Sequence, residues 1–212
     1  MKNLFKNSPR RLAQLSCITL CGLGIATAAS GAVVPLEAGL KQILLERAYD
    51  RSVETKTPHK PWVWADMAAV GKITHPRLGQ SAIILSAGSK EAMRAGPTLM
   101  PGSADIGTAG ASVIAAHRDT HFAFLKDVKI GDVMLASGKD GKMRNYRVTH
   151  LQIVHADKFA ITAGLPENTL ALSTCYPFGS VRGGKMRYVV HAIEFEGQAS
   201  ENLPEKGLQS AI

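Results

Sequence analysis

Between residues 62 and 196, short apolar runs alternate with breaks of glycine and proline, and this pattern most restricts the fold. The chain has 20 glycines and 10 prolines, and the apolar runs are too short for the sustained 3.6-residue periodicity of a helical bundle. We expect a helical turn at 91–95, a loop at 99–110, and strands at 69–75, 81–86, 112–116, 132–137, 143–149, 151–156, 170–174 and 186–196. About eight short strands without a long helix between them predict a mainly β fold, an antiparallel barrel or sandwich.

The N-terminal part differs in composition from this β region. Residues 1–11 are basic, and residues 12–36 carry no charged side chain over a length sufficient to cross a bilayer. An uncleaved membrane anchor is favoured because the run is longer than the core of a signal peptide; a signal peptide with a cleavage site at Ala26-Thr-Ala28 is the alternative. The preceding basic residues predict a single-pass protein of the inner membrane, with the remaining chain on the periplasmic side.

Residues 37–51 are predicted to form an amphipathic helix with Leu40, Ile43, Leu44 and Ala48 on one face. We expect that face to pack on the domain, with the membrane surface as the alternative, and a polar linker to follow at 52–62. Trp62 and Trp64 are predicted to lie on one face of an extended segment. The net charge is +8, but residues 12–212 carry only +4, from 21 basic and 17 acidic side chains. Because no dense basic patch is interleaved with aromatic residues, we predict no nucleic-acid partner.

Cys175 is the single cysteine outside the N-terminal apolar run, which holds Cys17 and Cys21. An exported domain with one cysteine cannot form an internal disulfide, so this thiol is either a buried packing residue or a reactive group. It ends the apolar run Thr169-Leu-Ala-Leu-Ser-Thr-Cys175, which reads as a buried strand stopped by Pro177. A thiol at a strand end is held rigidly and can still meet a substrate.

A nucleophilic cysteine needs a group that exchanges its proton and a cation that meets the oxyanion formed on attack. His117 ends the apolar run Ser112-Val-Ile-Ala-Ala-His117, and Arg187 begins Arg187-Tyr-Val-Val. His121 is a competing imidazole, and Arg182 is a competing guanidinium in the glycine-rich loop. We prefer Arg187 because regular elements position catalytic groups better than loops do. No cluster supplies a third or fourth metal ligand beside the two histidines, so we predict neither a metal site nor a cofactor.

These runs match a known family. Ser112 to Phe122, Leu172-Ser-Thr-Cys175-Tyr-Pro-Phe and Met186-Arg187-Tyr-Val-Val resemble the three signature strands of sortases. The resemblance is greater still to the Gram-negative (class GN) sortases of proteobacteria, in Pro61-Trp-Val-Trp-Ala-Asp66, Gly96-Pro-Thr-Leu-Met-Pro-Gly102 and His117-Arg-Asp-Thr-His-Phe. The resemblance implies a closed eight-stranded sortase β-barrel with short helices, here preceded by an N-terminal transmembrane helix.

The resemblance also implies a cysteine transpeptidase that cuts a C-terminal LPXTG-like sorting signal of an exported partner protein at its Thr–Gly bond. Cys175 would be the nucleophile, His117 the proton donor to the leaving amine, and Arg187 the stabiliser of the oxyanion. The acyl group would pass to an amine of unknown identity; transfer to water, and a non-catalytic periplasmic binding barrel, are the alternatives. The expected organisation is a basic N-terminus at 1–11, an anchor at 12–36, an amphipathic helix and linker at 37–61, a catalytic barrel at 62–196 and a disordered tail at 197–212.

Overall fold

The structure is a computed structural model that describes residues 8–86, 89–158, 168–180 and 184–197. The chain forms two compact units, residues 1–43 and residues 44–212. The helix α1 (Ser8–Thr55) runs through the first unit and ends in the second, which also holds every strand in the described part of the chain. Residues 1–7 and 198–212, which include most of the expected basic N-terminus and disordered tail, lie outside the described residues.

Helix α1 joins the predicted segments at 12–36 and 37–51 into one helix, and it continues four residues into the expected linker. The hydroxyl groups of Ser52 and Thr55 donate to the carbonyl oxygens of Ala48 and Arg51, at 2.8 and 2.9 Å, so polar side chains there are compatible with a helix. Over the described residues, no helix combines the length and the apolar character that crossing a membrane requires.

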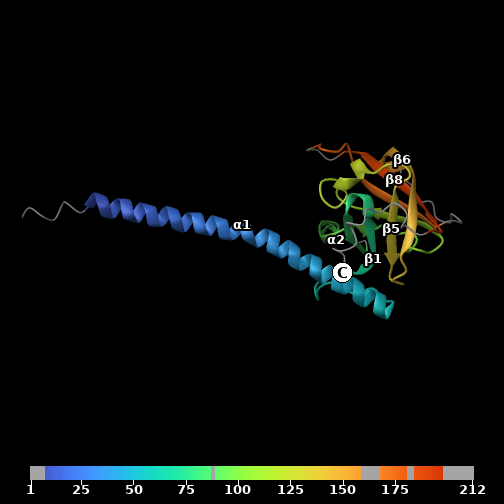
Figure 1. Ribbon diagram of the computed structural model, residues 1–212, viewed down its shortest axis with the longest axis horizontal. Coiled ribbons are helices and arrows are strands. Elements are labelled where there is room, and N and C mark those ends of the chain that lie inside the picture. Colours follow the sequence, from blue (N-terminus) through green and yellow to red (C-terminus); the bar gives the residue numbers. More distant parts are fainter. Residues whose placement is uncertain (1–7, 87–88, 159–167, 181–183, 198–212) are drawn as a thin grey trace, which may run out of the picture. The chain divides into compact units, whose positions relative to one another are not determined.

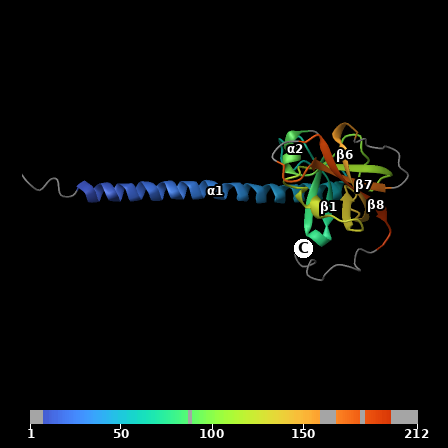
Figure 2. The same ribbon diagram turned by 90° about the horizontal axis from the view of Figure 1, so that it is seen from above.

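Within the described residues, eight strands close into a barrel in the order β1-β2-β3-β4-β7-β8-β6-β5 (Figures 1 and 2). The strands are β1 (Ala69–His75), β2 (Gln80–Ser86), β3 (Thr98–Leu99), β4 (Gly110–Ala115), β5 (Val133–Gly138), β6 (Arg144–His155), β7 (Asn168–Tyr176) and β8 (Met186–Phe195). The short helices are α2 (Lys90–Ala95) and the 3-10 turns η1 (Pro76–Leu78), η2 (Ala123–Asp127) and η3 (Ala156–Lys158). The predicted mainly β fold, a closed eight-stranded barrel with short helices, is confirmed.

Three details of the sheet differ from the predictions. The barrel is mixed, because β2 pairs with β3, and β4 with β7, in parallel. The runs at 143–149 and 151–156 are one strand, β6, whose pairing with β8 has an irregularity between Val148 and His150 that absorbs the polar interruption. The strand that the sequence did not predict is β3, which has two residues and begins just before the expected loop at 99–110. It is too short to give a periodic signal in the sequence.

Side chains alternate between the two faces of each strand and so separate two apolar clusters. Leu170 and Leu172 of β7 lie in the main core inside the barrel, whereas Ala171 lies in a small cluster on the outer face. That outer cluster consists of Ala111, Val113, Ala171 and Val189, with Met100 and Val154 packed against it. By the same alternation, Ser173 and Cys175 face outward, so the end of β7 presents the thiol on the outside of the barrel.

The last turns of α1 pack on the barrel, within the second unit. Leu45, Ala48 and Tyr49 are buried in one cluster with residues of β1, β2 and α2. Of the predicted apolar face, Ala48 is buried and Leu44 is partly buried, whereas Leu40 and Ile43 are exposed, so the prediction of a buried stripe holds only for its C-terminal part. The Tyr49 hydroxyl group lies 2.6 Å from Ser137 Oγ and donates to the carbonyl oxygen of Gly138 at 3.3 Å. Burial raises the pKa of Tyr49, so this hydroxyl stays protonated and keeps its hydrogen bonds at neutral pH.

Trp62 and Trp64 do not share a face, so that prediction is wrong. The segment is a turn, in which the Ala65 N–H donates to the Trp62 carbonyl oxygen at 3.0 Å. Trp62 packs against the cluster beneath α1 and buries its indole Nε1 without a hydrogen-bond partner in the described structure. Trp64 is 80% exposed. The prediction depended on strand alternation, which a turn does not obey.

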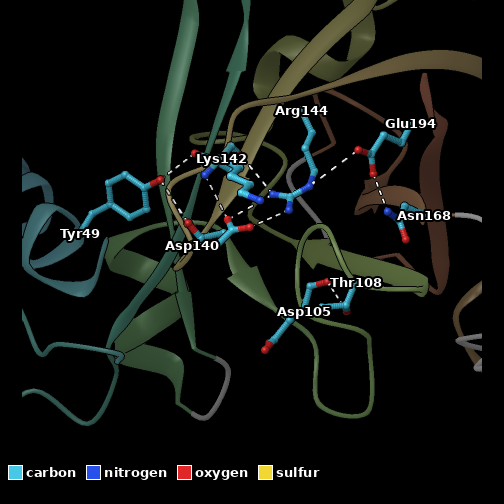
Figure 3. A network of polar contacts seen from close by, with 10 residues as sticks. Tyr49, Asp105, Thr108, Asp140, Lys142, Arg144, Asn168 and Glu194 are labelled. Carbon is cyan, nitrogen blue, oxygen red and sulfur yellow. Dashed lines mark hydrogen bonds and ion pairs between the residues drawn. The ribbon is translucent and has the colours of Figure 1, made fainter. Parts of the chain in front are cut away.

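A polar network joins the start of β7 to the strands around it (Figure 3). Arg144 Nη2 donates to the Asp140 carboxylate at 2.6 Å, and its Nε lies 3.7 Å from Glu194. Glu194 in turn accepts a hydrogen bond from Asn168 Nδ2 at 2.6 Å. Gly107 lies against the Arg144 guanidinium, where a Cβ atom would overlap it and where φ is +81°. The network therefore fixes β7 at the end opposite to the candidate nucleophile.

Candidate active site

Cys175 lies near the C-terminal end of β7, on the outer face of the barrel. The β-branched and apolar residues 169–174 favour the strand, and Pro177 ends it because proline has no N–H to continue the ladder. The Tyr176–Pro177 peptide bond is cis. The side chain of Cys175 is partly exposed. The strand thus holds the sulfur in a fixed position and leaves one side open to solvent.

The strand register brings Cys175 and Arg187 to one level of the sheet, next to the end of β4 that precedes His117. Cys175 is directly opposite Arg187 in the β7–β8 pair. The β4–β7 ladder ends at Ala115 and Ser173, and the Ala116 N–H still donates to the Ser173 carbonyl oxygen at 3.2 Å. His117 lies two residues beyond the last paired residue of β4, just as Cys175 lies two residues beyond Ser173, the partner of that residue. Since neighbouring strands are about 4.8 Å apart, Arg187 lies directly beside Cys175, and we predict that the imidazole of His117 lies on the other side of the thiol.

The side chains of Cys175 and Arg187 belong to the same face of the sheet. Val113 of β4, Ala171 of β7 and Val189 of β8 lie in the outer cluster, and residues an even number of positions further along each strand share that face. Cys175 and Arg187 satisfy this rule, and His117 has the same even spacing from Val113 but lies two residues beyond β4.

Arg187 is partly buried and is held by its own loop and strand. Its Nη1 donates to the carbonyl oxygens of Gly184 and Met186, at 3.0 and 3.1 Å. A guanidinium carries five N–H donors, and these two bonds involve only Nη1. The competing residue Arg182 lies outside the described residues, so the choice between the two remains a prediction.

His117 is exposed beside β7, whereas the competing His121 lies elsewhere. His121 lines a cavity of about 180 Å³ together with His75 and Phe124, and its Nε2 is 3.4 Å from the carbonyl oxygen of Arg94. The buried His75 is itself 3.2 Å from Asp132. Across the described residues, no three side chains of His, Cys, Asp or Glu are grouped so that they could hold a metal ion.

Arg118 has a larger part in the site than the sequence suggested. It forms an ion pair with Asp119, with Arg118 Nε 3.0 Å from Asp119 Oδ1. Hydrogen bonds from Arg118 lower the pKa of Asp119, and the nearby His117 adds a smaller effect in the same direction. Arg118 itself is buried and also donates to the carbonyl oxygens of Pro177 and Ser180. The sequence feature that could have indicated this role of Arg118 is its position directly after the candidate histidine, His117.

Thr174 faces inward and links β7 to the strand that carries His117. Its side chain is buried, and Oγ1 donates to the carbonyl oxygen of Ala116 at 2.8 Å. We expect Thr174→Val to lower the free energy of unfolding by about 1–3 kcal/mol, because the Ala116 carbonyl loses a buried partner. Thr174→Ser keeps the hydroxyl group and is the matched control. Urea unfolding of both variants checks this, and equal stabilities would contradict a role for the hydroxyl.

His191 and His150 stack on the barrel surface, with ring centroids 4.1 Å apart and an interplanar angle of 7°. Burial, and secondly the neighbouring His150, lower the pKa of His191 to about 4. An unfolded histidine titrates near pH 6.5. Between about pH 6.5 and 4 the unfolded chain therefore binds a proton that the folded protein excludes, and stability falls as the pH is lowered through this range.

We expect His191→Phe to weaken this acid dependence, because phenylalanine keeps a flat ring and does not titrate. Between pH 7 and 4.5 the wild-type protein should lose about 1–2 kcal/mol more unfolding free energy than the variant, after allowance for partial solvent exposure. Urea unfolding at both pH values measures the difference. Burial also lowers the pKa of His75, so some acid dependence remains in both proteins. Identical losses in the two proteins would contradict the assignment to His191.

Comparison with known proteins defines the class. The sortase domain family matches residues 73–194, and no curated protein matches the chain. Among solved structures, a Clostridium perfringens sortase D5 transpeptidase has a TM-score of 0.61 at 16% identity, over 74% of this chain and 99% of that one. A lid mutant of Corynebacterium diphtheriae sortase A gives 0.56 at 18%, over 77% and 97%. Streptococcus agalactiae sortase C1, in complex with MTSET, gives 0.54 at 21%, over 60% and 68%.

The barrel thus has the sortase fold, and the sortase domain covers more than half of the chain. The chain belongs to the sortase family. Sortases are cysteine transpeptidases that act on sorting-signal substrates, so the protein is an enzyme of this class.

Proposed function

We propose that the protein cleaves an LPXTG-like sorting signal at the C-terminus of an exported protein and transfers the cleaved chain to an amine. The observation that carries the proposal is the pairing of Cys175 with Arg187 across β7 and β8, beside the end of β4 that His117 follows by two residues. A thiol, an imidazole and a guanidinium are the groups that acyl transfer requires.

In the proposed reaction, the Cys175 thiolate attacks the carbonyl carbon of the threonine before the scissile bond, and the carbonyl oxygen becomes an oxyanion. Arg187 donates to that oxyanion. As the tetrahedral intermediate collapses, the C–N bond breaks and His117 gives its proton to the leaving amine of glycine. The resulting thioester is attacked by an acceptor amine, His117 takes up the proton of that amine, and the new amide leaves with Cys175 restored as the thiolate.

The test is product analysis of a peptide with an LPXTG-like sequence, incubated with the full-length protein in detergent, with and without an added amine such as triglycine. The proposal predicts cleavage between threonine and glycine and a new product that carries the added amine. Cleavage to the free acid alone, even at high amine concentration, would indicate a sorting-signal endopeptidase instead. The absence of any cleavage across a panel of such peptides would contradict the proposed substrate class.

We also propose that the enzyme is of the Gram-negative class and is anchored in the inner membrane with its barrel in the periplasm. The class is supported by the sequence elements at 61–66, 96–102 and 117–122, and the anchor by the uncharged run at 12–36 behind four basic residues. Membrane fractionation of a Gram-negative host followed by N-terminal mass analysis tests the anchor. Recovery of a soluble chain that begins after Ala28 would show a cleaved signal peptide and contradict it.

A further inference from the structure

Arg118 is a buried cation at the mouth of the site. Its side chain is only 6% exposed, and burial of a guanidinium is costly unless its donors are paired. Its Nε and Nη2 donate to the two carboxylate oxygens of Asp119, at 3.0 and 3.1 Å. Its Nη1 donates to the carbonyl oxygen of Pro177 at 2.6 Å, and Nη2 also donates to that of Ser180. One side chain therefore satisfies acceptors from two segments that are about 60 residues apart in the chain.

The two segments are the ones that follow the reactive residues. Arg118 comes directly after His117, and Pro177 lies two residues beyond Cys175. The guanidinium is also close enough to Cys175 that a charge on the sulfur raises the pKa of Arg118, an effect smaller than that of Asp119. Any movement of the loop after Cys175 relative to the end of β4 would have to break the bonds of Arg118.

We propose that Arg118 is a positioning residue of the transpeptidation reaction, which clamps the loop after Cys175 to the strand end that carries His117 and so fixes the thiol and the imidazole relative to each other. This inference depends on the proposed function of Cys175 and His117. Four of the five N–H donors of the guanidinium are directed at carbonyl and carboxylate oxygens of the protein, so we assign it to holding the loop and not to binding the oxyanion.

The loop has a second, apolar attachment that should keep the fold intact without Arg118. Phe178 packs against the main core, and its ring makes an edge-to-face contact with Tyr188, with centroids 5.2 Å apart. Loss of the Arg118 hydrogen bonds should therefore release the backbone carbonyl groups of Pro177 and Ser180, while β7 stays in the barrel. A displacement of about 1 Å at a catalytic group is enough to slow a reaction about 100-fold.

The test uses the full-length protein with Cys17→Ser and Cys21→Ser, so that Cys175 is the single thiol. In this background we expect Arg118→Met to lower kcat for the sorting peptide by about 10- to 100-fold with KM changed less than about threefold. Arg118→Lys should recover only part of the loss, because an ammonium cannot span two carbonyls and a carboxylate as the planar fork does. Full recovery with lysine would show that charge alone matters and would overturn the clamp.

Two control variants isolate the clamp. Asp119→Asn leaves the bonds to the loop in place and should keep kcat within about threefold of the wild type. A loss as large as that of Arg118→Met would assign the role to the ion pair and overturn the proposal. Arg77→Met removes a guanidinium that also donates to a carboxylate and a backbone carbonyl, at the η1 turn. It should leave kcat unchanged, and an equal loss there would show a general effect of arginine removal.

A readout without sorting peptide separates this inference from the proposed function. The rate of Cys175 alkylation by iodoacetamide at pH 7.5 should fall about 3- to 10-fold in Arg118→Met and stay unchanged in Arg77→Met. If the wild-type protein cleaves no sorting peptide but the alkylation rates differ in this way, the clamp stands and the substrate class fails. If the wild-type protein is active and Arg118→Met matches it in both assays, the clamp is overturned and the function stands. Thermal unfolding of each variant verifies that the barrel remains folded.

Discussion

Replacing Cys175 with alanine abolishes formation of the acyl-enzyme and lowers turnover of the sorting peptide by at least about 10⁴-fold. The loss is this large because the proposed reaction passes through a thioester, and alanine offers no atom that can form one. Incubation with the sorting peptide and intact-mass measurement should show the wild-type protein heavier by the acyl fragment. The Cys175→Ala protein should keep its unmodified mass.

The matched controls are Cys17→Ala and Cys21→Ala, which remove the other two thiols of the chain. Both proteins should form the adduct as the wild type does, since neither residue belongs to the barrel. Persistence of the adduct in Cys175→Ala would mean that another group is acylated, and the assigned nucleophile would be wrong.

Replacing His117 with alanine is expected to lower kcat/KM for the amide substrate by about 10²- to 10⁴-fold. Amide cleavage needs a proton on the leaving nitrogen, and His117, two residues beyond the end of β4, is the imidazole that we propose for this step. A thioester substrate has a leaving group that departs without a proton. On that substrate the loss in His117→Ala should shrink to about tenfold or less.

His150→Ala is the control, because this imidazole lies on β6 and is stacked on His191. Its kcat/KM on both substrates should equal that of the wild type. Equal losses of His117→Ala on the amide and the thioester would show that His117 does not protonate the leaving group. A loss below about twofold on the amide would remove it from the mechanism.

Local sequence signals predicted most of the elements that carry the site. Pro76 and Gly79 enclose the turn between β1 and β2, and Pro177 marks the end of β7, because each restricts the backbone in a way that depends on few neighbours. The alternation of side chains along β7 could also be predicted from the sequence. It places Thr174 on the inner face and Cys175 on the outer face. A thiol on an open face could therefore be predicted before the barrel was known.

Other features depended on contacts between distant segments. Nothing near β4 in the sequence indicates that its neighbour is β7, in parallel, since pairing is decided by how the whole barrel closes. The contacts of Arg118 with Pro177 and Ser180 follow from that same pairing, and the residues next to Arg118 in the sequence give no indication that it is buried. Trp64 shows the converse case, in which a single turn hydrogen bond overrides the strand pattern.

The parallel pairing of β4 with β7 has a consequence for when the enzyme becomes competent. Thr174 and Ala116, whose hydrogen bond joins the two strands, are 58 positions apart, so their meeting requires closure of a long loop with its entropic cost. Contacts of this kind form late and slow the folding of β proteins. A newly made chain therefore carries an isolated sulfhydryl group, and acylating chemistry begins only when the strand topology is complete.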